Sequence, residues 1–210
     1  MHYSTWLINL LTQNYSDSTT VNLVLAPEYP LSLSLDLASG YYNQYKLKIS
    51  SEPIVKYTYV DVPTEDFFVF FKKYKEDPQH YPYTFVYVSR VLEHIEVDNL
   101  EFFVFELSNI MQEGGRIYTL TPRMDVLYKH MLTQDISVGS FEFRKMCYEI
   151  YGGTGDARNY HKWYTTEKTI KELFTIENLF SLDQEPKYYN IMNPFTKEDE
   201  ETVELVFRRL

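Results

Sequence analysis

Extended and helical periodicities alternate along the first half of the chain. Leucines alternate with serine and aspartate over 33–37, which predicts a strand that runs into a turn of small residues at 38–40. A second extended run covers 55–60. Aromatic residues at spacings of three and four then predict a helix over 64–76. The pattern so far is strand, turn, strand and helix.

The middle of the chain continues this alternation. β-Branched and aromatic residues over 83–88 predict a buried parallel strand. Apolar residues at spacings of three and four predict a helix that begins at Asp98 and ends at Gly114 and Gly115, and a further strand follows over 117–120. Strands that alternate with helices in this way predict an α/β fold with a parallel sheet covered on both faces.

The remainder of the chain predicts three more helices and two short strands. The helices are expected over 124–132, 140–150 and 166–174, and the strands over 176–180 and 203–207. A polar stretch, 183–201, is interpreted as a surface connection. We expect one domain over 1–210, in which 1–30 form an N-terminal cap and 123–165 form an insertion on the substrate side.

Composition and charge narrow the class of protein. Of the 210 residues 44% are hydrophobic and 24% are charged, which excludes a disordered or low-complexity chain. A formal net charge of −10 disfavours broad electrostatic binding to nucleic acid or anionic lipid. No stretch approaches the roughly 18 apolar residues of a membrane-spanning helix. Cys147 is the only cysteine, so an internal disulfide is excluded and we expect a soluble cytoplasmic protein.

Several chemical motifs are missing from the sequence. The glycine-rich segment 152–155 lacks the Gly-Lys-Ser/Thr ending of a phosphate-binding loop. The five histidines include no His-x-x-x-His pair and no calcium-loop pattern occurs, so we expect no structural metal. A Gly-x-Ser-x-Gly elbow is also missing, which disfavours a serine hydrolase. The turn at 38–40 stays the candidate for close approach to a ligand, because its small residues expose backbone amides.

One segment carries a specific resemblance. Residues 83–95 read Tyr-Thr-Phe-Val-Tyr-Val-Ser-Arg-Val-Leu-Glu-His-Ile, and a predicted helix, the Gly114-Gly115 turn and Thr121-Pro122 follow. The pattern continues in 151–153 and 159–165, before another predicted helix. These segments resemble class I S-adenosylmethionine-dependent methyltransferases. Their order and spacing match the fourth strand of that family, its Val-Leu-Glu-His-Ile segment, the following helix, the Gly-Gly turn and the fifth strand. The resemblance covers roughly 33–180.

This resemblance implies a Rossmann-like methyltransferase fold with an antiparallel C-terminal strand, and S-adenosylmethionine as cofactor. It places the methionine part of the cofactor over 36–40, the adenine or ribose at Asp61, and the adenosyl and methionine groups beside 89–92. The cofactor-binding residues that it implies are Asp36, Leu37, Ala38, Ser39, Gly40, Asp61, Ser89, Arg90, Val91 and Leu92.

The chain departs from the pattern of that family at four places. Ala38-Ser39-Gly40 stands where the family has two glycines around one residue. Tyr83 replaces an aspartate at the start of the fourth strand, and Thr175-Ile176 replaces a Gly-Phe pair. If 45–49 is the second strand, no acidic residue ends that strand to hold the ribose, and Asp61 ends the third strand instead.

The predicted function is methyl transfer to an oxygen or nitrogen acceptor on a small-molecule, sugar or lipid-type substrate. His94 and His161 are the candidate catalytic residues, because histidine can accept a proton near neutral pH. Both could instead satisfy backbone groups of neighbouring loops, as could Glu93. The alternative function is a non-catalytic binding or assembly module on the same fold. A nucleic-acid methyltransferase is disfavoured, since the chain lacks an Asn-Pro-Pro-Tyr motif.

Overall fold

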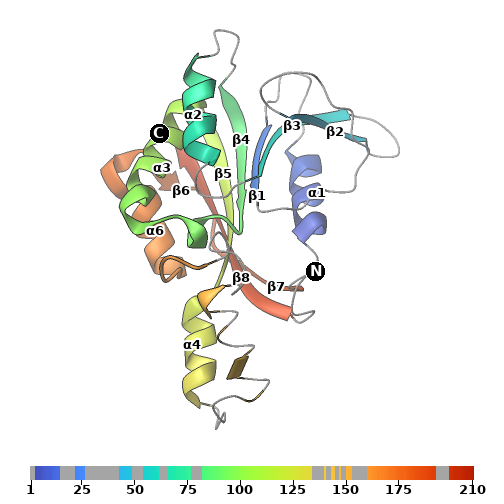
Figure 1. The fold of residues 1–210 in the computed structure, drawn as a ribbon. Helices are drawn as coiled ribbons and strands as arrows, with labels where there is room; N and C mark the ends of the chain where they lie inside the picture. Colours follow the sequence, from blue (N-terminus) through green and yellow to red (C-terminus); the bar gives the residue numbers. More distant parts are fainter. Residues whose placement is uncertain are drawn as a thin grey trace.

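A computed structural model describes most of the chain. The described residues are 3–14, 22–26, 43–48, 54–61, 66–76, 82–133, 140, 143–144, 147, 150–152, 160–192 and 199–210. They build one mixed sheet with helices on both of its faces (Figure 1).

The sheet contains eight strands in the order β2-β3-β1-β4-β5-β8-β6, with β7 also paired to β8. Their bounds are β1 Asn22–Ala26, β2 Asn43–Lys48, β3 Ile54–Asp61, β4 Tyr83–Ser89, β5 Met111–Pro122, β6 Phe180–Leu182, β7 Lys187–Met192 and β8 Asp199–Arg209. The four strands β3, β1, β4 and β5 are parallel neighbours, whereas β2, β6, β7 and β8 pair in antiparallel fashion. The predicted α/β fold with an antiparallel C-terminal strand is therefore confirmed.

Helices cover the two faces of this sheet unequally. Their bounds are α1 Tyr3–Gln13, α2 Asp66–Glu76, α3 Val97–Ile110, α4 Met124–Thr133 and α6 Glu167–Thr175, with short 3-10 helices η1 at Leu92–His94 and η3 at Ile176–Asn178. The helices α2, α3 and α6 lie on one face and α1 lies on the other, while α4 projects from the carboxyl end of β5 (Figure 1). Within the described residues, no helix combines the length and apolarity that crossing a membrane requires.

Aromatic side chains fill the layer between the sheet and α2, α3 and α6. Phe71 of α2 and Phe103 of α3 meet edge to face, with ring centroids 6.0 Å apart. Phe174 of α6 stacks on Phe207 of β8 at 4.6 Å. All four rings are buried, and full burial of one such side chain contributes about 1.5–3 kcal/mol. This layer is the main apolar core of the described residues.

The opposite face of the sheet uses polar contacts to hold α1. Trp6 donates its Nε1–H to the buried carboxylate of Glu204 on β8. The Asn14 side-chain amide donates to the Tyr87 hydroxyl at 3.1 Å and accepts from the Tyr118 hydroxyl at 3.1 Å. The two tyrosine rings stack with centroids 5.4 Å apart. These contacts fix α1 on β4, β5 and β8.

The first parallel strand differs from the prediction. β1 covers Asn22–Ala26, within the segment 1–30 that was expected to form a cap, and it lies in the middle of the sheet. The predicted strand 33–37 lies outside the described residues. Residues 22–26 contain only a short apolar run, so local pattern alone does not predict a central strand there. Pairing with β3 and β4, which depends on residues far along the chain, determines the central position.

The C-terminal region differs as well. The predicted surface connection 183–201 contains all of β7 and the start of β8. The predicted strand 176–180 begins as η3, in which Glu177 has a φ of 55°, so the strand itself starts only at Phe180. The polar residues of 183–201 made β7 and the start of β8 resemble a loop, although these two strands pair with each other.

The middle segments follow their predictions more closely, as in β4, α2, α4 and α6. However, α3 ends at Ile110 rather than at the two glycines, because Met111 already pairs with Tyr83 of β4. The predicted helix 140–150 falls largely outside the described residues.

Gly115 of β5 provides a test of the close strand pairing. A Cβ atom at this position would lie 2.9 Å from the carbonyl oxygen of Gln112 and 3.1 Å from that of Thr84. Since both contacts are backbone atoms, Gly115→Ala is expected to lower the free energy of unfolding by about 1–3 kcal/mol in urea titrations. Gly114→Asn is the control: its φ of 74° suits asparagine and nothing lies within 4 Å, so its cost is expected below about 1 kcal/mol. Equal losses would contradict the close approach.

Candidate functional site

The carboxyl ends of β1, β3 and β4 lie in one row. Ala26 at the end of β1 pairs with Asp61 at the end of β3. Leu25 of β1 pairs with Val88, and Ser89 then ends β4. Because β3 and β4 flank β1 on opposite sides, the strand order reverses at this point. Open α/β sheets bind ligands at such a reversal, beyond the carboxyl ends of the strands.

The predicted cofactor residues are spread unevenly along this edge. Asp61 is the last residue of β3, which neighbours β1, whereas β2 is the antiparallel edge strand. The side chains of Val91 and Leu92 are buried in the core and expose no surface to a ligand. The residues predicted beneath the methionine part of the cofactor lie outside the described residues; they are Asp36, Leu37, Ala38, Ser39 and Gly40.

The chain turns sharply after β4. Arg90 adopts a φ of 57°, in a region that residues other than glycine seldom occupy. Its backbone N–H donates to the carbonyl oxygen of Leu120 on β5 at 2.9 Å. The 3-10 helix η1 follows directly and carries Glu93 and His94. The strained turn thus brings a carboxylate and an imidazole to the carboxyl edge of the sheet.

Arg90 is a largely buried cation between two buried carboxylates. Its Nε lies 3.2 Å from Oε1 of Glu93, and its Nη1 lies 2.6 Å from Oε2 of Glu200 on β8. Glu93 is 0% exposed and Glu200 is 2% exposed. Buried charges are costly unless they are paired, so the guanidinium stabilises both carboxylates.

A second segment, 160–165, is held against the same turn. Three hydrogen bonds attach it: the Lys162 N–H to the Glu93 carbonyl at 2.7 Å, the Trp163 Nε1–H to the Leu92 carbonyl at 2.5 Å, and the His94 Nδ1–H to the Tyr160 carbonyl at 3.2 Å. These contacts join parts of the chain that are 66 to 71 residues apart. As a result His161 lies beside η1.

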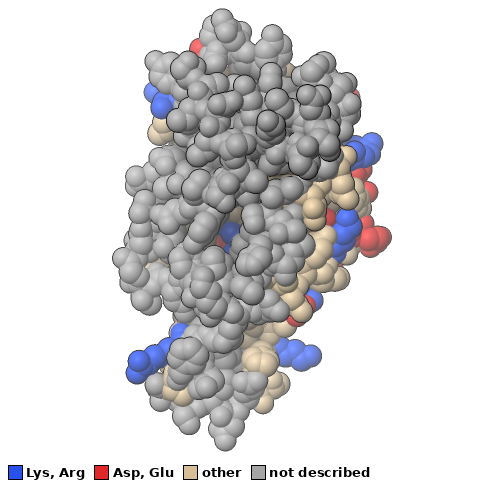
Figure 2. Space-filling model, turned by 90° about the vertical axis from the view of Figure 1, so that its right-hand side faces the viewer, with Lys and Arg blue, Asp and Glu red and all other residues tan. Residues whose placement is uncertain are grey.

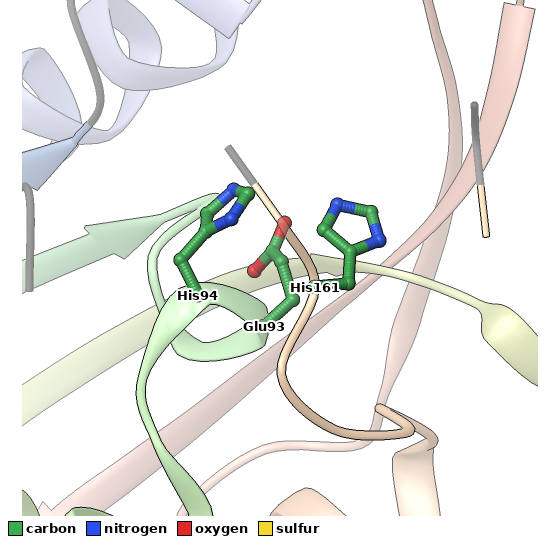
Figure 3. Close-up of side chains that lie close together, drawn as sticks. All are labelled: Glu93, His94 and His161. Atoms are coloured by element: carbon green, nitrogen blue, oxygen red, sulfur yellow. The ribbon is translucent and has the colours of Figure 1, made fainter. Parts of the chain in front are cut away.

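Glu93, His94 and His161 converge at this edge, and Figure 3 shows the carboxylate between the two imidazole rings. One ligand atom from each residue lies within 4.8 Å of the other two, and the ring centroids are 5.0 Å apart. The Nδ1 of His161 lies 3.0 Å from the carbonyl oxygen of Ile150. Because a carbonyl oxygen only accepts, both Nδ1 atoms donate, which leaves Nε2 of each neutral ring with an available lone pair.

Burial lowers the pKa of both histidines. The pKa of His161 falls to about 3, chiefly because the ring is buried, and further because Arg90 and His94 lie nearby. Burial also lowers the pKa of His94, although neighbouring Glu93 raises it. Both rings are therefore neutral at pH 7. They can accept a hydrogen bond or bind a cation at Nε2.

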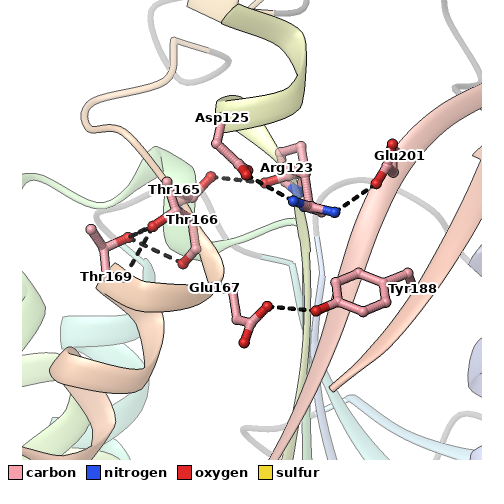
Figure 4. A network of polar contacts seen from close by, with 9 residues as sticks. Arg123, Asp125, Thr165, Thr166, Glu167, Thr169, Tyr188 and Glu201 are labelled. Atoms are coloured by element: carbon pink, nitrogen blue, oxygen red, sulfur yellow. Dashed lines mark hydrogen bonds and ion pairs between the residues drawn. The ribbon is translucent and has the colours of Figure 1, made fainter. Parts of the chain in front are cut away.

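A polar network fixes the chain beyond His161 (Figure 4). It consists of Arg123 paired with Asp125 and with Glu201 at 2.8 Å each, the Tyr188 hydroxyl donating to Glu167 at 2.6 Å, and the Thr165 hydroxyl donating to the Pro122 carbonyl at 3.1 Å. Thr166 and Thr169 form a capping box at the start of α6. The segment 160–165 is consequently attached to η1 at one end and to β5 and α6 at the other.

Sequence reasoning missed Glu200 entirely. The acidic run around this residue is typical of a solvated loop, and its partner Arg90 lies far away in the sequence. It also missed the convergence of Glu93 with the two histidines, since spacing rules detect ligands on one helix and not on two loops. The one available signal was the Glu93-His94 pair directly after a predicted strand.

Solved structures with a similar fold are S-adenosylmethionine-dependent methyltransferases. One, from Methanosarcina mazei, aligns with a TM-score of 0.54 at 11% identity, covering 95% of this chain and 97% of its own. Another, from Archaeoglobus fulgidus, gives 0.53 at 10% identity and covers 98% and 92%. No protein-family model matches the chain, and no curated protein has a significantly similar sequence. The chain therefore has the Rossmann-like fold of these two methyltransferases, and at this identity the likeness extends to the fold alone.

Replacing Arg90 tests the ion pairs that hold the site. Arg90→Met leaves Glu93 and Glu200 buried without their cation, so the free energy of unfolding is expected to fall by about 3–5 kcal/mol. Arg208→Met is the matched control, because Arg208 pairs with Asp183 at the surface and its loss is expected to cost less than about 1 kcal/mol. Urea titration of both variants measures the two losses in the free energy of unfolding. Similar costs for the two would show that Arg90 contributes no more than a surface arginine.

Proposed function

We propose that this protein transfers a methyl group from S-adenosylmethionine to an oxygen or nitrogen acceptor on a small-molecule, sugar or lipid-type substrate. The observation that carries the proposal is the row of strand ends at the reversal of strand order, with Asp61 and Ser89 on either side of β1. Strands two positions apart are about 10 Å from each other, which suits a ligand of nucleoside size.

The residue types at this edge suit the cofactor. A carboxylate at Asp61 can accept two hydrogen bonds from the neighbouring hydroxyls of a ribose. The charge of Arg90 is paired with two carboxylates, which reduces its repulsion of a cationic ligand nearby. When bound, S-adenosylmethionine supplies a methyl group on a positively charged sulfur, which passes in line to a nucleophilic acceptor. Residues of this chain then supply position and orientation, which are worth roughly 7–11 kcal/mol at best.

The two histidines are the proposed orienting groups for the acceptor. Each ring is fixed by a hydrogen bond from Nδ1 to a backbone carbonyl, so its direction is set before an acceptor binds. Each Nε2 has a lone pair that can accept a hydrogen bond from a hydroxyl or an amine. His94 and His161 therefore support methyl transfer to oxygen or nitrogen rather than to carbon.

Charge supports a small acceptor over a nucleic acid. The net charge of the chain is −10. On the face drawn in Figure 2, where grey atoms cover most of the surface, the basic and acidic side chains of the described residues occur in small separate groups. A nucleic-acid substrate would require a continuous basic surface to meet its phosphates.

A second candidate is a non-catalytic binding or assembly module on the same fold. It is favoured by one observation: the segment after β1 contains no glycine from Pro27 to Ser39. Glycine lets a backbone approach a ligand closely. In the methyltransferase pattern two glycines flank one residue, and here Ala38 stands in place of the first of them. Cofactor binding by the purified protein separates the two candidates, because a module without a cofactor site has no reason to bind it.

Asp61→Ala is expected to weaken binding of S-adenosylhomocysteine by about 1.5–3 kcal/mol in a calorimetric titration, the usual worth of hydrogen bonds to a charged group. Asp98→Ala is the control, because Asp98 is an exposed residue at the start of α3, on the face of the sheet that α2, α3 and α6 cover. Methyl transfer itself is followed as release of S-adenosylhomocysteine from S-adenosylmethionine with mixtures of candidate acceptors.

The outcomes of this titration separate three accounts. Tight binding of S-adenosylhomocysteine by the wild type, weakened by Asp61→Ala, supports the proposed site. Equal affinities of wild type and Asp61→Ala remove Asp61 from it. A wild type that binds no cofactor at millimolar concentration favours the non-catalytic module.

A further inference from the structure

We propose that Glu93, His94 and His161 form a binding site for a divalent transition-metal ion such as Zn²⁺. The three side chains come from two loops and meet at the carboxyl edge of the sheet (Figure 3). Their ligand atoms lie within 4.8 Å of one another. Two ligands of a tetrahedral zinc ion, each about 2.1 Å from the metal, lie about 3.4 Å apart. For all three side chains to bind one zinc ion, the widest pair must therefore approach by at most roughly 1.4 Å.

The histidine rings are already oriented as metal ligands usually are. In metal sites the second ring nitrogen of a ligand histidine donates to a carbonyl or carboxylate, which fixes the ring and its tautomer. Here the Nδ1 of His94 donates to the carbonyl of Tyr160, and the Nδ1 of His161 donates to the carbonyl of Ile150. Both Nε2 lone pairs are thus available to a cation without any change of tautomer.

Glu93 gives an independent reason to expect a cation. The residue is 0% exposed, and neither of its carboxylate oxygens has a hydrogen-bond partner within the described residues. Its ion pair with Arg90, at 3.2 Å, supplies charge but no hydrogen bond. A buried carboxylate in this condition is costly, and coordination to a metal ion is one of the few arrangements that satisfies it.

The described charges around the three side chains are of both signs. Glu93 and Glu200 share the guanidinium of Arg90. The 2.6 Å pair with Glu200 keeps Arg90 in place while a divalent ion binds Glu93. Glu200 therefore offsets part of the electrostatic repulsion that Arg90 exerts on a bound cation.

The donor set selects the class of metal. Two imidazole nitrogens and one carboxylate suit Zn²⁺, Co²⁺, Ni²⁺ or Fe²⁺, whereas Mg²⁺ and Ca²⁺ prefer oxygen ligands alone. Three protein ligands leave at least one coordination position open, as in catalytic rather than structural zinc sites. A hydroxyl or amine of a small molecule can occupy that position. The metal site rests on the geometry of these three side chains and does not depend on methyl transfer.

The test uses Co²⁺ as a spectroscopic probe and Zn²⁺ as a competitor. The full chain, stripped with a chelator, is titrated with Co²⁺ while visible absorption and heat are recorded. Wild type is expected to bind one Co²⁺ per chain, Zn²⁺ to displace it, and excess Mg²⁺ to leave it bound. Glu93→Gln and His161→Ala are each expected to weaken Co²⁺ binding about 100-fold or more, since loss of a second-shell partner alone costs 10–100-fold.

His130→Ala is the matched control, because His130 is an exposed histidine on α4 and its removal is expected to leave Co²⁺ binding unchanged. Wild type that binds neither Co²⁺ nor Zn²⁺, or variants of Glu93 and His161 that bind as wild type does, would overturn the site. Displacement of Co²⁺ by Mg²⁺ would overturn the assignment to a transition metal. Circular dichroism shows which variants are folded. If no variant is folded, metal binding by the wild type decides whether the site exists. Titration with S-adenosylhomocysteine in parallel reports separately on the proposed function.

Discussion

The site depends on the pairing of Arg90 with two buried carboxylates. Arg90 reaches Glu93 directly after β4 and Glu200 on β8, so a single guanidinium connects the parallel half of the sheet to its antiparallel end. Without it both buried carboxylates would lose this counter-charge. The positive φ of Arg90 is the conformational cost of placing it there. The turn that follows then carries His94 to the segment that holds His161.

Two features of the fold place chemistry at the same edge of the sheet. The reversal of strand order beside β1 puts Asp61 and Ser89 where ligands of open α/β sheets bind. The hydrogen bonds of segment 160–165 to η1 put a carboxylate and two imidazoles there as well. The proposed cofactor site and the proposed acceptor or metal site thus lie at one edge, as methyl transfer requires, since donor and acceptor must meet in line.

The sequence allowed prediction of elements whose signal is local. β4 and the following turn were predicted because 83–95 combine β-branched residues with a specific motif. The end of β3 at Asp61 was predicted because an extended run covers 55–60. β1 was missed, since 22–26 contain only a short apolar run and the central place of this strand depends on its pairing with β3 and β4. The start of β8 was missed because Glu200 is buried through a partner that is distant in sequence, and the convergence of His94 with His161 depends on backbone contacts between two loops.

The most direct test of the central claim is a crystal structure of the protein with S-adenosylhomocysteine. The account predicts that the adenosyl group lies beyond the carboxyl ends of β1 and β4, with the ribose hydroxyls within hydrogen-bond distance of the Asp61 carboxylate. Electron density for the ligand at any other place on the sheet would contradict the account, as would a side chain of the protein filling the space beside Asp61.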